Sequence, residues 1–142
     1  MNWQRELNRF LEGQINMAKI MIIDDASSVR SLLQKTLATA GHTVIEAETG
    51  NEGCDKILKN KDIDLIITDY NMPGMDGLAM LAKVKETLGK QPFPVVVLTT
   101  ETDERLKAAS RDVGVIGWVN KPVTQETILS VVKKLVSMKK AA

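Results

Sequence analysis

Short apolar segments alternate with longer amphipathic segments along the chain from Lys19 onward. The apolar segments are rich in β-branched and aliphatic residues, which indicates strands. Five strands are expected, at residues 20–23, 43–47, 65–68, 95–99 and 116–119. The amphipathic segments indicate five helices, which begin near residues 27, 51, 78, 106 and 124. Strands that alternate with helices in this way predict an α/β fold with a parallel sheet.

The third and fourth strands are nearly continuous apolar runs, as expected for central strands that are covered on both faces. Ser27 and Ser28 are favourable N-cap residues for the first helix, and Gly41 is placed to close it. Thr124 is placed to cap the last helix. In open parallel sheets, ligands bind beyond the carboxyl ends of the strands. Polar residues at those ends are therefore the first candidates for a functional site.

Composition narrows the classes of protein. A chain of 142 residues with 44% hydrophobic residues fits one domain with a substantial core. The formal net charge of +1 argues against a nucleic-acid-coating protein, so no nucleic-acid partner is expected. No apolar run approaches the roughly 20 residues that cross a bilayer, and the charged N-terminus is unlike a signal peptide. We expect a soluble, cytoplasmic protein without membrane insertion.

Two residue types that often carry chemistry occur only once. Cys54 shares a helical stripe with Ile57 and Leu58, which favours a small buried residue over a reactive thiol. His42 follows Gly41 at a turn, which favours a solvated surface histidine over a metal ligand or a phosphate acceptor. With a single histidine in the chain, a histidine-based metal site and Ser-His-Asp catalysis are both strongly disfavoured.

Polar residues stand at the carboxyl ends of four predicted strands: Asp24 and Asp25, Asp69, Thr99 and Lys121. Taken singly, each has a structural explanation, such as helix capping for the Asp24–Asp25 pair. Together they place three carboxylates, a hydroxyl and an ammonium at one edge of an apolar sheet. Clustered carboxylates repel one another unless a cation neutralises them. Mg²⁺ suits such a site, because it takes one or two carboxylates and leaves room for a phosphate oxygen.

These residues lie in motifs that resemble those of the response-regulator receiver family: Asp24–Asp25, Thr68–Gly77, Leu98–Glu101 and Val119–Pro122. The resemblance extends from about Lys19 to the C-terminus. It implies a flavodoxin-like, doubly wound sheet of five parallel strands with five helices and the strand order 2-1-3-4-5. Within the family, the Asp-aromatic-Asn-Met-Pro-Gly-Met-Asp-Gly loop is most similar to that of stand-alone chemotaxis regulators.

The resemblance also assigns roles at the site. Asp69 would be the phosphoacceptor, and Lys121 would pair with the phosphoryl oxygens. Asp25 and Asp69 would bind Mg²⁺ directly, Asp24 through water and Asn71 through its backbone carbonyl. The Lys121–Pro122 peptide bond would be cis, a conformation that is favourable only before proline.

Three further positions receive roles in switching and signal lifetime. Thr99 would hydrogen-bond the phosphoryl group once it is attached, and Trp118 stands at the aromatic switch position of the family. The family usually has Tyr or Phe there. Because the indole is larger, the alternative interpretation is that Trp118 is a static surface residue. Asn71 and Glu101 stand at the positions that modulate dephosphorylation.

The implied function is a single-domain response regulator of a two-component system. It would be a phosphoprotein that takes its phosphoryl group from a sensor histidine kinase and then binds a motor, a kinase or a phosphotransfer protein differently. Chemotaxis-like signalling is the first hypothesis, and a phosphorelay intermediate is the alternative. The chain is expected to catalyse its own phosphorylation and dephosphorylation without being an enzyme. A hydrolase with an aspartate nucleophile is disfavoured, because its second acid would stand where this chain has Asn71.

The N-terminal extension, residues 1–17, lies outside the resemblance, which assigns residues 18–142 to the receiver domain. Apolar residues at helical spacing, Trp3, Leu7, Phe10 and Leu11, fall on one face of a predicted helix. Such a helix would dock on the domain or pair two copies, whereas isolated helices this short are marginal in water. Two alternatives stay open: an amphipathic helix, or a disordered segment. A monomer is expected, with a dimer through the extension as the alternative.

Overall fold

The structure is a computed structural model that describes residues 3–5, 7, 17–91, 93–100 and 104–141. Its strands are β1 (Lys19–Ile23), β2 (Thr43–Ala47), β3 (Leu65–Asp69), β4 (Val95–Thr99) and β5 (Val115–Asn120). Its helices from residue 17 onward are α2 (Ser27–Thr39), α3 (Gly50–Lys59), α4 (Gly77–Leu88), α5 (Glu104–Ser110) and α6 (Gln125–Ala141), with one 3-10 turn, η1 (Arg111–Val113).

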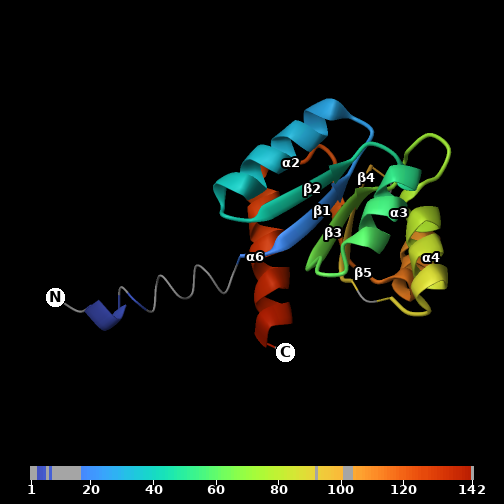
Figure 1. Ribbon diagram of the computed structural model, residues 1–142. Helices are drawn as coiled ribbons and strands as arrows, with labels where there is room; N and C mark the ends of the chain where they lie inside the picture. The colour runs from blue at the N-terminus through green and yellow to red at the C-terminus, as the bar shows by residue number, and fades with distance from the viewer. Residues whose placement is uncertain (1–2, 6, 8–16, 92, 101–103, 142) are drawn as a thin grey trace.

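The five strands form one parallel sheet in the order β2-β1-β3-β4-β5. The predicted α/β fold and its strand order are therefore confirmed. In the register, Ile23 lies beside Thr68 and Asp69 lies beside Leu98. Consequently β1, β3 and β4 end at nearly the same level, and the residues that follow them gather at one edge of the sheet (Figure 1).

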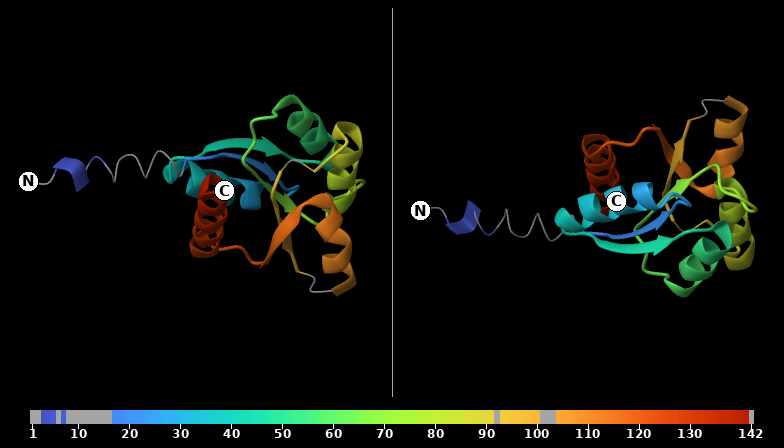
Figure 2. Two further views of the ribbon diagram at one scale, coloured as in Figure 1. Left: turned by 90° about the horizontal axis from the view of Figure 1, so that it is seen from below. Right: turned by 90° about the horizontal axis from the view of Figure 1, so that it is seen from above.

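Helices cover both faces of the sheet, and two apolar clusters hold them there (Figures 1 and 2). On one face, α2 and α6 pack on the sheet through residues such as Leu33, Leu37 and Val132. On the other face, α3 and α4 contribute residues such as Ile57 and Leu81. Side chains of β3 and β4 are buried along their whole length, which agrees with the prediction that both strands are central.

Glycines occupy two of the turns between helices and strands. Gly41 has φ +97°, a left-handed conformation that favours glycine, and it follows the end of α2 as predicted. Gly77 begins α4 beside β3, and its N–H donates to the Tyr70 carbonyl at 2.9 Å. A Cβ atom at Gly77 would collide with the Asp69 carbonyl oxygen. Only glycine therefore lets α4 start so close to Asp69.

Helix caps partly follow the predictions. Thr124 caps α6, since its Oγ1 accepts from the Thr127 N–H at 3.2 Å. The predicted capping of α2 by Ser27 and Ser28 is wrong, because the N-cap residue is Ala26, which has no side-chain cap. The Ala26 N–H instead donates to Asp24 Oδ1 at 2.8 Å. Asp24 thereby shapes the turn that leads from β1 into α2.

Of the predictions for Cys54 and His42, one is confirmed and the other is wrong. Cys54 is buried in the α3–α4 cluster, as predicted. The prediction of a solvated His42 is wrong: its Nδ1 accepts a hydrogen bond from the Ala18 N–H at 3.0 Å, and burial lowers its pKa.

Among the described residues, no helix is long and apolar enough to cross a membrane. Most of residues 1–17 lie outside the described part of the chain, so the extension stays a prediction.

Candidate functional site

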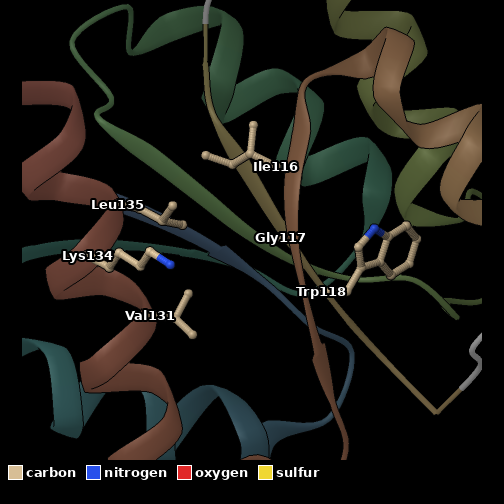
Figure 3. A pocket seen from close by; sticks show the side chains of 6 residues that line it. All are labelled: Ile116, Gly117, Trp118, Val131, Lys134 and Leu135. Carbon is tan, nitrogen blue, oxygen red and sulfur yellow. The ribbon is translucent and has the colours of Figure 1, made fainter. Parts of the chain in front are cut away.

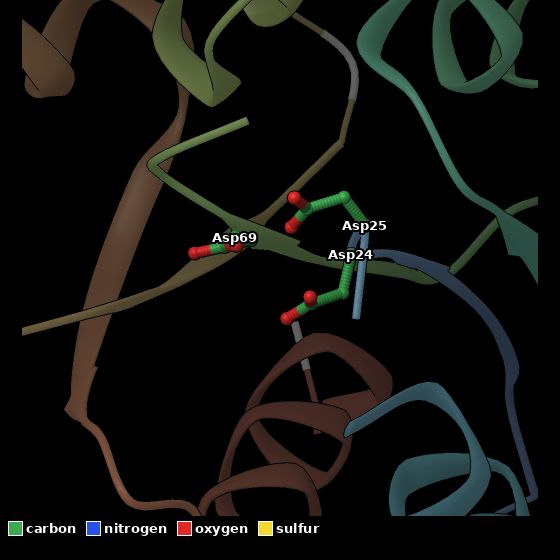
Figure 4. A group of neighbouring side chains, drawn as sticks. All are labelled: Asp24, Asp25 and Asp69. Carbon is green, nitrogen blue, oxygen red and sulfur yellow. The ribbon is translucent and has the colours of Figure 1, made fainter. Parts of the chain in front are cut away.

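Three carboxylates meet beyond the ends of β1 and β3. Asp24 and Asp25 follow β1, and Asp69 is the last residue of β3. One oxygen from each carboxylate lies within 4.8 Å of the others. Figure 4 shows the three side chains directed toward the same space at the sheet edge. Asp24 and Asp69 are buried, whereas Asp25 is exposed at the rim of the group.

Lys121 follows β5 and reaches two of these carboxylates. Its Nζ lies 2.9 Å from Asp69 Oδ1 and 3.5 Å from Asp24 Oδ2. The peptide bond after it, Lys121–Pro122, is cis, as the resemblance implied. Its backbone N–H donates to the Thr99 carbonyl at 3.0 Å, so the ends of β4 and β5 are tied together. One ammonium thus faces three carboxylates.

Burial and the neighbouring charges shift the pKa values of Asp69, Asp24 and Lys121. Burial raises the pKa of Asp69; the hydrogen bond from Lys121 opposes the rise, and the charge of Asp24 adds to it. Burial likewise raises the pKa of Asp24 despite the hydrogen bond from Ala26 and the positive charge of Lys121. Burial alone would lower the pKa of Lys121, yet the hydrogen bond to Asp69 and the charge of Asp24 raise it. The site therefore has negative charge that its own lysine does not balance.

A divalent cation with oxygen ligands fits this donor set. Asp24 Oδ2 is buried and has no hydrogen-bond partner, although Lys121 lies 3.5 Å away. A buried oxygen without a hydrogen-bond partner costs free energy unless something binds it. Three carboxylates around one space form the hard, anionic environment that Mg²⁺ prefers. Asp24, Asp25 and Asp69 are the carboxylates that would hold the ion.

Three further residues were predicted to belong to the site: Thr99, Asn71 and Glu101. Thr99 ends β4 and is 1% exposed, one residue beyond the partner of Asp69 in the sheet register. Asn71 is exposed in the loop after β3. Glu101 lies outside the described residues. The structure thus brings Asp24, Asp25, Asp69 and Lys121 into direct proximity, and Thr99 lies at the same sheet edge.

Trp118 lies in β5 beside Val97 of β4 and is half-buried against the cluster that includes α3 and α4. On the α6 side of β5, a cavity of about 360 Å³ has six lining residues: Ile116, Gly117, Trp118, Val131, Lys134 and Leu135. Figure 3 shows the indole directed away from the α6 side chains that line this cavity. Ile116 is 55% exposed, so apolar surface is open to a partner here.

Arg30 is a site residue that the sequence did not single out. Its Nη1 donates to the backbone carbonyl of Asp24 at 2.6 Å, and its side chain is only 14% exposed. On a helical wheel, an arginine on an amphipathic helix is indistinguishable from a solvated surface cation. The only available signal was its position one turn into the helix that follows Asp24 and Asp25.

The fold and the acidic strand ends define a flavodoxin-like α/β domain with a cluster of carboxylates at one edge of its sheet. A sequence profile of the response regulator receiver domain matches residues 20–133. The chemotaxis protein CheY homologue of Campylobacter jejuni is 35% identical over 111 residues, 78% of this chain and 85% of that protein. The chemotaxis protein CheY4 of Vibrio cholerae superposes with a TM-score of 0.77 at 36% identity, over 84% of this chain and 98% of that chain.

The chain belongs to the response regulator receiver domain family. The similarity also extends to part of a longer protein. The DNA-binding transcriptional regulator NtrC of Salmonella typhimurium is 33% identical over 119 residues, which cover 83% of this chain but 24% of that protein. Receiver domains therefore occur among the relatives both as most of a small protein and as one part of a larger one.

Proposed function

We propose that this chain is a response regulator of a two-component system that accepts a phosphoryl group on Asp69 from a sensor histidine kinase. The observation that carries the proposal is the position of Asp69: a buried carboxylate beside two other carboxylates and 2.9 Å from Lys121. The similarity to chemotaxis proteins supports a chemotaxis-like role in the cytoplasm. The monomer is the proposed working form.

The chemistry requires positioning and electrostatic compensation rather than a general base. A carboxylate oxygen of Asp69 forms a bond to phosphorus while the phosphorus–nitrogen bond of a phosphohistidine breaks, and the electron pair stays on the imidazole. Lys121 stabilises the negative charge on the transferring group, since its Nζ already lies beside Asp69. Mg²⁺, held by Asp24, Asp25, Asp69 and the Asn71 carbonyl, would neutralise part of that charge. The product is an acyl phosphate, which water hydrolyses.

The signal is proposed to leave the site through Thr99 and Trp118. A phosphoryl group on Asp69 would add hydrogen-bond acceptors at the end of β3, and the Thr99 hydroxyl at the end of the adjacent β4 would donate to them. Movement of Thr99 changes the space beside β5, where Trp118 packs. The surface of α5, β5 and α6 would then change its affinity for a partner, as a two-state element biased by one local charge.

Fluorescence tests this switch without a partner. In a Trp3→Phe variant, Trp118 is the only tryptophan, because the chain has two. Adding beryllofluoride, a stand-in for the phosphoryl group, together with Mg²⁺ is expected to shift the Trp118 emission, because the environment of the indole changes. A Trp3→Phe/Thr99→Ala double variant should bind beryllofluoride with little or no shift. Unchanged Trp118 emission despite beryllofluoride binding measured by calorimetry would show that Trp118 is a static surface residue.

The lifetime of the phosphorylated form separates the chemotaxis-like role from the phosphorelay alternative. Asn71 and Glu101 match the pair found in chemotaxis regulators, whose signal must be brief, so rapid autodephosphorylation is expected. Asn71→Arg should change the rate, because a bulky cation beside the acyl phosphate alters the access of water. Release of inorganic phosphate after removal of the phosphodonor gives the rate. A phosphorylated form that persists for hours would favour a relay that passes its phosphoryl group to a histidine phosphotransfer protein.

A further inference from the structure

Arg30 connects the turn after β1, which carries Asp24, to the segment between β2 and α3. It lies in the first turns of α2, and its Nη1 donates to the Asp24 carbonyl at 2.6 Å. Its Nη2 lies 3.5 Å from Glu48 Oε1, in the segment between β2 and α3. The guanidinium therefore bridges the turn that carries Asp24 and Asp25 to a second loop. Arginine suits this bridge, because its planar group has several donors in a fixed geometry.

Asp24 is fixed by contacts at its backbone and at one carboxylate oxygen. Its backbone N–H donates to the Ala47 carbonyl at 3.2 Å, and its Oδ1 accepts from the Ala26 N–H at 2.8 Å. Arg30 holds the remaining backbone group, the carbonyl. These three hydrogen bonds leave Asp24 Oδ2 buried and without a hydrogen-bond partner, 3.5 Å from Lys121 Nζ. Of the three contacts, only the one from Arg30 comes from a side chain that can be replaced without changing Asp24 itself.

We propose that Arg30 is a positioning residue that fixes the Asp24–Asp25 turn in the geometry required for binding a divalent cation. The inference rests on the proposed Mg²⁺ site and assigns a role to a residue outside the cation's ligands. Groups that orient metal ligands typically contribute a factor of about 10–100 in metal affinity. The Arg30 side chain is buried enough to hold one geometry, with 14% of its surface exposed.

The direction in which replacing Arg30 changes Mg²⁺ affinity separates a positioning role from a purely electrostatic one. Arg30 is a cation close to a site for a cation, so its charge alone opposes Mg²⁺ binding. If charge were its only influence, removing it would tighten Mg²⁺ binding. If the hydrogen bond to the Asp24 carbonyl positions the ligands, removing Arg30 weakens binding even though a repulsive charge is lost. The two explanations therefore predict opposite changes in the dissociation constant.

The test is isothermal titration of the unphosphorylated full chain with MgCl₂ alone. Arg30→Met keeps an aliphatic side chain of similar reach but no donor, and it should raise the dissociation constant about tenfold. Arg30→Lys keeps an ammonium donor for the Asp24 carbonyl but loses the planar fork that also reaches Glu48, so it should raise the dissociation constant by a smaller factor. Lys35→Met, which removes an exposed cation from the same helix, is the matched control and should bind Mg²⁺ as the wild type does.

Urea unfolding without Mg²⁺ accompanies each titration, so that a loss of folding is not mistaken for a loss of binding. If Arg30→Met does not fold, the charge-conserving Arg30→Lys variant decides. Wild-type binding combined with unchanged or tighter binding in folded Arg30 variants overturns the positioning role and leaves the proposed function intact. Absence of Mg²⁺ binding in the wild type itself overturns both the metal site and this inference.

Discussion

Chelation of divalent cations with EDTA is expected to reduce phosphorylation of the chain by acetyl phosphate to the level of a reaction without phosphodonor. Three carboxylates share one space, and Lys121 is the one described cation within ion-pair distance of Asp24 and Asp69. An incoming phosphoryl group brings further negative charge to this edge of the sheet. Without a divalent cation, the repulsion would keep the phosphodonor away from Asp69.

Restoring the cation is the control for the chelation experiment. Adding MgCl₂ in excess over EDTA should restore phosphorylation, which shows that EDTA did not damage the protein. Asp25→Asn should need a higher Mg²⁺ concentration than the wild type for half-maximal phosphorylation, because it removes one charged ligand at the exposed rim of the site. Phosphorylation that is equally fast with and without EDTA would contradict the proposed metal dependence.

The fold was predictable because the hydrophobic pattern and the topology agree. The buried runs of β3 and β4 indicated central strands, and the structure buries every residue of both. The strand order itself came from the family resemblance, since the apolar pattern of a parallel strand does not say which strand lies beside it. The start of α2 was predicted correctly from Ser27 and Ser28, but its capping was not. Asp24 Oδ1 takes the Ala26 N–H, and neither serine then serves as the cap.

The acidic cluster was predictable because parallel strands end at one edge, so residues far apart in sequence meet there. Asp24, Asp69 and Lys121 lie where this argument placed them. His42 was misjudged because its acceptor role depends on the Ala18 backbone, 24 positions away in the sequence. Arg30 was missed for the same kind of reason. Arg30 contacts the Asp24 backbone carbonyl and Glu48 at the same time, and the periodicity of side chains in the sequence does not encode such contacts.

Asp69→Asn is expected to abolish phosphorylation. The substitution keeps the size of the side chain but replaces a nucleophilic carboxylate oxygen with an amide, which cannot form the acyl phosphate. It also removes one of the three carboxylates at the proposed cation site, so both nucleophile and ligand are lost. The fold should survive, because an uncharged group at this buried position no longer needs Lys121 for compensation. The loss is expected to exceed two orders of magnitude in rate.

A matched control separates the loss of this carboxylate from the loss of any aspartate. Asp112 is exposed in η1, away from the acidic cluster, and Asp112→Asn should be phosphorylated as the wild type is. Circular dichroism and urea unfolding of both variants should match the wild type in shape and cooperativity. A loss of phosphorylation in Asp69→Asn is informative only if this variant is folded.

Intact-protein mass spectrometry after incubation with Mg²⁺ and acetyl phosphate tests the central claim most directly. The wild type and Asp112→Asn should each gain the mass of one phosphoryl group, and Asp69→Asn should gain none. Peptide mapping of the wild type should place the group on the segment that contains Asp69. Undiminished phosphorylation of folded Asp69→Asn would contradict the assignment of Asp69 as the phosphoacceptor.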